Sequence, residues 1–430
     1  MSASQILTLY LILFALEYLW ETFLTWLNMR HVRAHAEAPP EAFREVVDSE
    51  TYRKSVDYTL TRGRFGIIRN TASSLFLLFI ILSGTLGRMD VLIAQWPLHS
   101  YLHGIVYIFT LSLMFSLFNL PFTLYSIFVI EERFGFNKMT WKLFIIDGLK
   151  SLVLSLVLLA PLFWGLFWFM DKTGNYWWLY AFGFLAGFQL LMVYLYPTVV
   201  APWFNKFTPL PDGSLKEKIL HLVQKVHFHT SGIFVMDGSK RSKHSNAYFT
   251  GLGRVKRIVL FDTLVDNLEE DQVVSVLAHE IGHEKKHHIK KGLALSLASM
   301  LAGLWILSLL LHYPSFFQAF GFSGPSYHAA IILFGFCSGP FTFFLTPLGS
   351  ILSRKYEYEA DRFAVEAMGT AHGLIGALLK LSKDNLSNLT PHPLYSFYYY
   401  SHPTLAERIA AMEDYEKRLN GQQKQAVAMG

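Results

Sequence analysis

The chain has 430 residues, of which 52% are hydrophobic and only 16% are charged, and its formal net charge is +5. Average soluble domains carry about 25% charged residues, so this composition excludes an ordinary soluble protein. The net positive charge is explained by basic connections between apolar blocks, and nothing in it indicates nucleic-acid binding. A single cysteine, Cys337, excludes an intramolecular disulfide framework.

The apolar residues are concentrated in long blocks. Most blocks reach, and two closely approach, the ~20 residues that a helix needs to cross a bilayer. The first is too long and too lightly flanked by basic residues to be a cleaved signal peptide. We therefore predict a mainly α, polytopic membrane protein with seven spans, at about residues 5–29, 68–87, 102–130, 149–171, 175–200, 292–312 and 328–351.

The Lys and Arg residues alternate between the connections. Many follow the first, third, fifth and seventh spans, whereas the other connections have Arg88 alone, Lys172 alone, or neither residue type. Because basic connections favour the cytosol, we expect the N-terminus outside and both large polar regions on the cytosolic side. The chain then divides into spans 1–5 (1–200), a first polar part (201–291), spans 6–7 (292–351) and a second polar part (352–430).

Within the polar parts, the pattern predicts a helix at about 214–227 and short strands at 232–237, 245–250 and 257–261. The turn Gly251-Leu252-Gly253 joins the last two strands, which indicates a β-hairpin. A helix begins near Asp271. The second polar part is predicted to be helical, with a loop at about 385–402 and a disordered tail at about 420–430.

The sequence His279-Glu280-Ile281-Gly282-His283 lies on the helix that begins near Asp271. Histidines four residues apart share one helical face and can bind a zinc ion, with the intervening glutamate beside its water. A catalytic zinc takes three protein ligands and one open position. His279 and His283 are therefore two candidate ligands, and a third is needed.

Two groups could supply the third ligand. His287 and His288 follow on the same helix, but eight residues span about 12 Å of helix, so a histidine there reaches the metal only if the chain bends. We therefore expect His287 and His288 to lie at the membrane interface or to hydrogen-bond to the metal ligands. The segment Glu357-Tyr358-Glu359-Ala360-Asp361 places Glu357 and Asp361 on one helical face. Glu357 could bind zinc while Asp361 accepts a hydrogen bond from a ligating histidine, or the segment is a solvated charged face.

If the metal site forms, Glu280 is the candidate general base. Zinc lowers the pKa of its bound water toward ~7, and the carboxylate can take the proton as the water attacks a peptide carbonyl. The developing oxyanion needs a further electrophile. His402, in a predicted loop, is a candidate for that role, although a lone loop histidine usually has none.

The chain resembles the integral-membrane zinc endopeptidases of the CAAX prenyl protease 1 family, in the gluzincin group. The order of segments and the seven spans are also those of that family. The matching segments are Ile130–Lys138, Ala201-Pro202, Phe207–Pro211, Ser245–Phe249, Ile258–Leu264, His279–His283, Glu357–Asp361 and Ser401–Thr404.

The resemblance implies roles for individual residues. His279, His283 and Glu357 would bind one Zn²⁺ per chain, Glu280 would be catalytic, and Asp361 would hydrogen-bond a ligand. His402 and Arg408 would line the active site, with His402 assisting the transition state. The resemblance also implies seven helices enclosing an aqueous chamber, capped by the zinc domain. The strand that begins at Asn246, with Ala247, Tyr248 and Phe249, would receive substrate as an added β-strand.

Polar residues within the spans are consistent with an aqueous interior. Glu17 and Glu21 lie four residues apart in the first span, and carboxylates at that depth face protein or water. Asn119 and Gln189 are further candidates. Ordinary hydrogen bonding between helices is the alternative, and it suits the two amides better than the two carboxylates.

The expected function is removal of the C-terminal aaX tripeptide from prenylated CAAX proteins. A first alternative is quality control of membrane proteins, by the same chemistry on unprenylated substrates. A remote alternative is a non-enzymatic transporter with a structural zinc site. The expected partners are a prenylated or other peptide substrate and the lipid bilayer. Short connections and a C-terminus without a dilysine signal favour a bacterial inner membrane over the endoplasmic reticulum.

Overall fold

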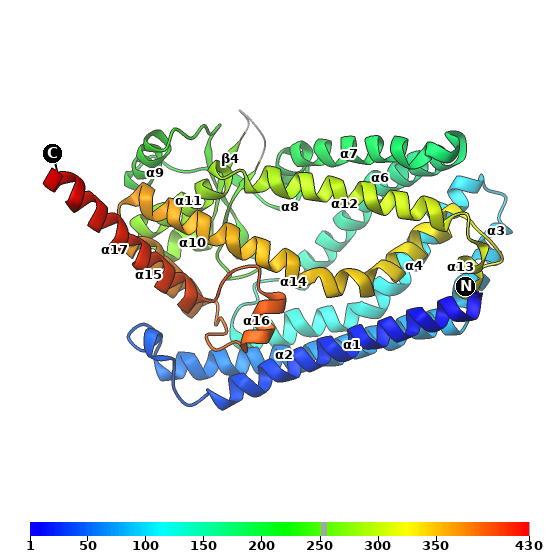
Figure 1. The fold of residues 1–430 in the computed structure, drawn as a ribbon, viewed down its shortest axis with the longest axis horizontal. Helices are drawn as coiled ribbons and strands as arrows, with labels where there is room; N and C mark the ends of the chain where they lie inside the picture. Colours follow the sequence, from blue (N-terminus) through cyan, green and yellow to red (C-terminus); the bar gives the residue numbers. More distant parts are fainter. Residues whose placement is uncertain (251–255, 430) are drawn as a thin grey trace.

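The computed structural model describes residues 1–250 and 256–429. Within these residues, seven helices are long and apolar enough to cross a membrane, as predicted. They form an elongated bundle with the two termini at opposite ends of its long axis (Figure 1). The membrane helices are α1 (Ala3–Ala34), α2 (Ser49–Leu82), α4 (Ser100–Tyr125), α6 (Trp141–Lys172), α7 (Trp177–Leu195), α12 (His288–Leu310) and α14 (Tyr327–Met368).

Several of these helices extend well beyond the predicted spans. A run of apolar residues identifies only the part of a helix that lies in lipid. The polar continuation of the same helix is therefore predicted to be a connection. The 34-residue helix α2 includes Arg62 and Arg64, which the sequence placed in a connection. The 42-residue helix α14 continues to Met368 and so carries Glu357 and Asp361. The candidate third ligand, Glu357, is thereby attached to a membrane helix.

Short elements complete the membrane part. Both α4 and α7 end in π-helical turns, η2 (Ser126–Glu131) and η4 (Tyr196–Val200), and π-turns are often found at functional sites. The remaining short elements are η1 (Glu41–Phe43), α3 (Thr85–Ala94), α5 (Glu132–Phe134), η3 (Gly174–Tyr176), α8 (Ala201–Phe204) and α13 (Pro314–Ala319).

The polar domain combines helices with a four-stranded mixed sheet. Strand order is β1-β2-β4-β3, in which β2 and β4 are parallel and the other pairs antiparallel. The strands are β1 (Phe207–Pro209), β2 (Ile233–Met236), β3 (Ala247–Thr250) and β4 (Arg257–Phe261). The helices are α9 (Ser214–Lys225), α10 (Asp262–Asn267), α11 (Glu270–Lys285), α15 (His372–Asp384), α16 (Pro393–Tyr399) and α17 (Leu405–Met429), with the 3₁₀ turn η5 (Gly238–Lys240).

Three predictions for the polar domain need comment. The antiparallel pairing of β3 with β4 confirms the hairpin partners, whereas the predicted turn at 251–253 lies outside the described residues. The predicted loop contains α16, whose first turn begins with Pro393 after the N-cap His392. The predicted disordered tail is wrong for its backbone, because α17 continues to Met429.

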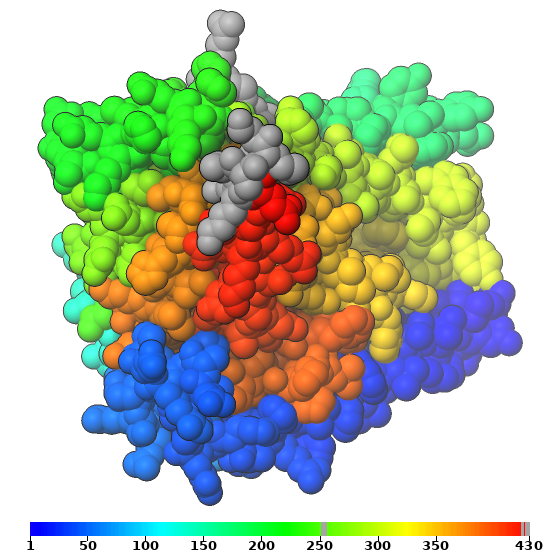
Figure 2. Space-filling view, turned by 60° about the vertical axis from the view of Figure 1, so that its left-hand side comes forward, coloured from blue at the N-terminus to red at the C-terminus, as the bar shows by residue number. Residues whose placement is uncertain are grey.

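The polar domain is assembled from segments that are far apart in sequence. One apolar core joins α9, the sheet, α11, α14 and α15, with Val273, Leu277 and Ile281 of α11 fully or almost fully buried. Figure 2 shows these green and orange segments gathered with red α17 and the blue N-terminal helices at one end of the molecule. A separate core fills the membrane bundle.

Candidate active site

Helices α11 and α14 bring the three predicted metal ligands together. Their ligand atoms are mutually close: His279 Nε2 lies 3.2 Å from His283 Nε2 and 3.3 Å from Glu357 Oε2. His283 Nε2 lies 3.3 Å from Glu357 Oε1. These three residues are also the group that could hold a metal ion among the described residues.

The spacing of the three ligands fits zinc. Tetrahedral bonds of about 2.0–2.1 Å place neighbouring ligand atoms about 3.3 Å apart. Glu357 Oε2 is buried and has no hydrogen-bond partner among the described residues, which is costly for a polar atom unless a cation or other partner satisfies it. Two imidazole nitrogens and one carboxylate form the donor set of a catalytic zinc site with an open fourth position.

Asp361 orients His279. His279 Nδ1 lies 2.8 Å from Asp361 Oδ1, and a carboxylate can accept a hydrogen bond only from a protonated nitrogen. This contact therefore assigns the proton of His279 to Nδ1 and leaves the Nε2 lone pair facing Glu357. Asp361 is itself held by Arg408, whose Nε and Nη2 donate to its two oxygens at 2.9 and 2.6 Å.

The position of Arg408 differs from the expected contact with substrate. Its side chain is buried and donates to Asp361, and its Nη2 also lies 3.7 Å from Glu357 Oε2. The 3.4 Å approach of Arg408 Nη2 to His279 Nδ1 brings two donors together, so it is a proximity rather than a hydrogen bond. Arg408 is therefore placed to fix Asp361 and, through it, the ring of His279.

His283 has its own supporting pair, which the sequence indicated only in part. His283 Nδ1 lies 3.0 Å from His288 Nδ1, and His288 Nε2 lies 3.0 Å from Glu359 Oε2. This chain of contacts places the protons on His283 Nδ1 and His288 Nε2, leaving His283 Nε2 for the metal. His287 is exposed. Its left-handed backbone conformation (φ 60°) begins helix α12 and turns His288 inward.

A glycine in the histidine motif lets the two ligand-bearing helices meet. A Cβ added at Gly282 would lie 3.0 Å from the Cα and 3.1 Å from the carbonyl oxygen of Ala360. Backbone atoms cannot move aside as a flexible side chain can, so any larger residue would separate α11 from α14. Gly282 thereby allows His279 and His283 to reach Glu357.

Glu280 points to the same site from the motif. It is largely buried, and burial is the main reason that its pKa is raised above the ordinary value. Protonation of His279 or His283 would oppose that increase. A carboxylate with a raised pKa is a stronger proton acceptor, as a general base requires.

His402 reaches the metal ligands from the loop between α16 and α17. Its Nε2 lies 3.3 Å from Glu357 Oε1, and its Nδ1 lies 2.9 Å from Ser401 Oγ. The His402 side chain is 58% exposed, facing a cavity, and partial loss of solvent there lowers its pKa, which favours the neutral ring at neutral pH. If the Ser401 hydroxyl donates to Nδ1, Nε2 carries the proton and can donate it in a hydrogen bond.

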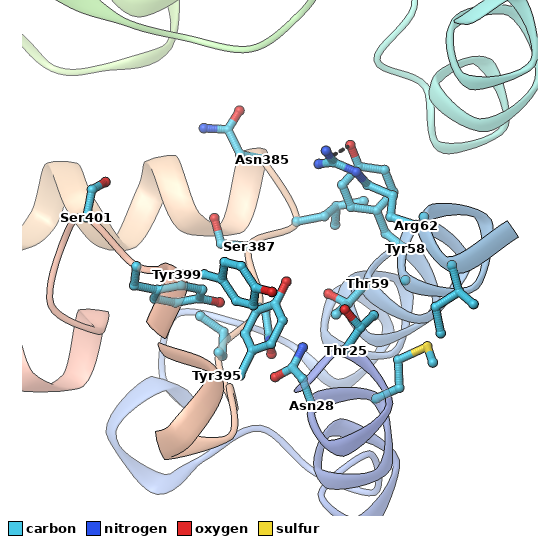
Figure 3. A pocket seen from close by; sticks show the side chains of 18 of the residues that line it. Thr25, Asn28, Tyr58, Thr59, Arg62, Asn385, Ser387, Tyr395, Tyr399 and Ser401 are labelled. Carbon is cyan, nitrogen blue, oxygen red and sulfur yellow. Dashed lines mark hydrogen bonds between the residues drawn. The ribbon is translucent and has the colours of Figure 1, made fainter. Parts of the chain in front are cut away.

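His402 also lines a cavity of about 1100 Å³ that extends into the membrane part. The cavity is bordered by α1, α2, α4 and the segment 382–405 rather than by all seven spans. Figure 3 shows Tyr58 and Arg62 of α2 on one wall and Tyr399 and Ser401 on another. Its walls carry many hydroxyl, amide and charged groups, which suits water or a peptide.

The intramembrane polar residues divide between this cavity and helix contacts. Glu21 accepts a hydrogen bond from Asn70 Nδ2 at 2.9 Å, and Asn119 accepts one from Ser73 Oγ at 3.0 Å. Glu21 and Asn119 line the cavity. Gln189 instead donates to Ser296 Oγ at 3.1 Å, between α7 and α12.

Strand β3, expected to receive substrate, is at the edge of the described sheet and packs against α11. The Asn246 carbonyl accepts from the Phe261 N–H at 3.0 Å, so these two residues form a hydrogen-bonded pair with β4. Such pairs alternate along an antiparallel ladder. The backbone groups of Ala247 and Phe249 therefore face the free edge, while the Phe249 side chain packs on Phe228 at a ring distance of 5.1 Å.

A group of three residues that could hold a metal ion, with an adjacent carboxylate and with its third member on the membrane helix α14, defines a membrane-anchored metallopeptidase. Comparison with known families agrees with this class. Residues 28–206 match the CAAX prenyl protease N-terminal model of five membrane helices, and residues 209–416 match peptidase family M48. The chain belongs to family M48 and is a zinc metallopeptidase with multiple membrane spans.

Individual relatives extend over almost the whole chain. A human CAAX prenyl protease 1 homolog is 35% identical, covering 92% of this chain and 93% of its own. The CAAX prenyl protease 1 of Saccharomyces cerevisiae is 37% identical and covers 94% of both. The crystal structure of S. mikatae Ste24p superposes with a TM-score of 0.89 at 35% identity, covering 96% of this chain and 99% of that one.

Proposed function

We propose that this protein removes the C-terminal aaX tripeptide from prenylated CAAX proteins or peptides, using one Zn²⁺ held by His279, His283 and Glu357. The observation that carries the proposal is the convergence of His279 and His283 of α11, the helix that also carries Glu280, on Glu357 of α14, with contacts of 3.2–3.3 Å between their nitrogen and oxygen atoms. The substrate class comes from the relatives, which are CAAX prenyl proteases.

The metal would supply Lewis acidity and would lower the pKa of a bound water toward ~7. Glu280 would accept a proton from the attacking water as the water oxygen forms a bond to the scissile carbonyl carbon. His402 donates a hydrogen bond from Nε2 to the negative charge that develops on the carbonyl oxygen. Glu280 then gives the proton to the leaving nitrogen as the C–N bond breaks, which releases a new amine and a new carboxylate.

Substrate alignment is assigned to β3 and the residue before it. The backbone groups of an added strand would pair with those of Ala247 and Phe249. Asn246 stands at the start of this edge, and its Oδ1 accepts the Ala247 N–H at 2.8 Å, so a substrate carbonyl would have to displace that side chain. Tyr248 and Phe249 contribute their backbone while their side chains pack inside the domain. Arg408 acts on this reaction by positioning Asp361.

We also propose the domain division 1–200, 201–291, 292–351 and 352–430, with the peptidase domain on the cytosolic side and the N-terminus outside. The boundary between the two family matches, near residues 206–209, supports the first division, and the alternating Lys and Arg support the orientation. The bacterial inner membrane stays a prediction, and the relatives named above are eukaryotic.

The test compares two peptides of one CAAX sequence, one farnesylated at cysteine and one not, incubated with detergent-purified protein. The proposal predicts release of the intact tripeptide, identified by mass, with the farnesylated peptide preferred. Equal cleavage of both peptides would favour membrane-protein quality control as the function. Cleavage of neither by zinc-loaded protein would contradict the proposed function.

A further inference from the structure

Arg62 is a cation in the polar cavity without a carboxylate at ion-pair distance among the described residues. It projects from α2 and is exposed to the cavity that also contains His402 (Figure 3). Among the described residues, its one polar contact joins Nη1 to the Tyr58 hydroxyl at 3.4 Å, and its guanidinium lies 5.3 Å from the centre of that ring. Most of its N–H groups are therefore available to a ligand.

Glu131, an acidic residue that lines a cavity together with Arg62, already has polar partners. Glu131, at the end of the π-turn η2, accepts the Tyr58 hydroxyl on Oε1 at 2.8 Å. Its Oε2 lies 3.5 Å from His244 Nε2, and His244 Nδ1 lies 2.8 Å from Asn385 Oδ1. These contacts hold the Tyr58 ring against the Arg62 guanidinium and keep His244 close to Glu131.

Arg62 and His244 share two cavities. Both line the large cavity that includes His402, and both line a neighbouring one of about 360 Å³ together with Tyr58 and Glu131. The pKa of His244 is raised, chiefly by its contact with Glu131 and in spite of burial. When His244 is protonated, this corner holds two positive groups, Arg62 and His244, and one carboxylate, Glu131.

The direction of β3 leads a substrate toward this corner. A peptide added antiparallel to β3 runs against it, so the part after the scissile bond leaves the strand at its N-terminal end. His244 is two residues before Asn246, at that end. Three extended residues span about 10 Å. A tripeptide that follows the scissile bond could therefore extend from the end of β3 into the cavity.

We propose that Arg62, assisted by His244, binds the C-terminal carboxylate of the peptide being cleaved. The planar guanidinium can hold both carboxylate oxygens at once. A carboxylate fixed there sets how many residues lie beyond the zinc, so Arg62 helps to select a short C-terminal fragment. This inference rests on the proposed function, because it concerns the same substrate.

The test uses three peptides of one CAAX sequence: the free acid, the C-terminal amide, and a form extended by two residues. They are given to the wild type, Arg62→Gln, Arg62→Lys and Arg69→Gln. Arg69 is the matched control, because it is a second arginine of α2 in the same cavity and lies about 10 Å further along the helix. Zinc content and melting temperature show whether each variant is folded.

The kcat/KM of the wild type should be about 10- to 100-fold higher for the acid than for the amide. This ratio corresponds to the free energy of one charge-assisted hydrogen bond. Arg62→Gln should reduce this ratio to about one while amide cleavage changes little, Arg62→Lys should restore part of it, and Arg69→Gln should keep it. The extended peptide should resemble the amide.

Equal cleavage of acid and amide by the wild type would overturn the inference and leave the proposed function standing. So would an equal loss of acid and amide cleavage in Arg62→Gln, which would mark a structural role. Failure of zinc-loaded wild type to cleave any of the peptides would contradict the proposed function itself.

Discussion

The Cα of Ala360 lies 3.0 Å from the place where Gly282 would carry a Cβ. Gly282→Ala should therefore force α11 and α14 apart, at a cost of about 1–3 kcal/mol typical of overpacking. Separation of the helices also moves His283 from Glu357, so zinc should bind more weakly. Melting temperature and zinc retention during dialysis measure both effects.

Gly292→Ala is the control for this substitution. Gly292 lies in helix α12, and a Cβ added there has nothing within 4 Å, so alanine should leave stability unchanged or slightly increase it. If Gly282→Ala matched Gly292→Ala in stability and zinc retention, the close approach of α11 and α14 would not matter for the site.

Asp361→Asn should weaken zinc binding by about 10- to 100-fold, the usual effect of losing the partner of a ligating histidine. The amide can present its NH₂ group to His279, and it leaves the Arg408 charge without its bidentate partner. Competition with a chelator of known affinity measures the change. Unaltered zinc affinity would show that Asp361 does not orient His279.

His288→Phe should also weaken zinc binding, because phenylalanine can keep the stacking on Tyr356, at a ring distance of 4.1 Å, but cannot bond His283 or Glu359. We expect a loss within the same range of about 10- to 100-fold. His287→Asn is the control, since asparagine tolerates the left-handed backbone and the ring it removes is exposed. Equal losses in both variants would contradict a specific role for His288.

The contact between His244 and Glu131 should stabilise the protein more at low pH than at high pH. The pKa of His244 is raised in the folded protein by Glu131, while Arg62 opposes the increase, and Asn385 and the Phe136 ring are its uncharged neighbours. The stabilisation is complete below the ordinary histidine pKa of about 6.5 and is lost as pH rises through the folded value.

Melting temperatures of wild type and His244→Gln, compared between pH 6 and pH 9, test this sign. The difference between the two proteins should be larger at pH 6. A constant difference across this range, or one that grows with pH, would contradict it.

Helical spacing alone places His279 beside His283 and Glu357 beside Asp361. The resemblance to the CAAX prenyl protease 1 family joined these two pairs into one predicted ligand set. The sequence did not predict β1, whose three residues include Pro209 and lie in a stretch typical of turns. The roles of Gly282 and Arg62 were also missed, because each depends on a neighbour distant in the sequence. From sequence alone, the charged end of a long helix such as α2 cannot be distinguished from a connection between two membrane spans.

The most direct test of the account measures zinc content and peptide cleavage together for wild type, Glu280→Gln and Glu357→Gln. The account predicts one zinc per chain in Glu280→Gln with cleavage reduced by about 10²- to 10⁴-fold, the contribution of general acid–base catalysis, and loss of both zinc and cleavage in Glu357→Gln. Cleavage at the wild-type rate by Glu280→Gln, or full zinc content in Glu357→Gln, would contradict it.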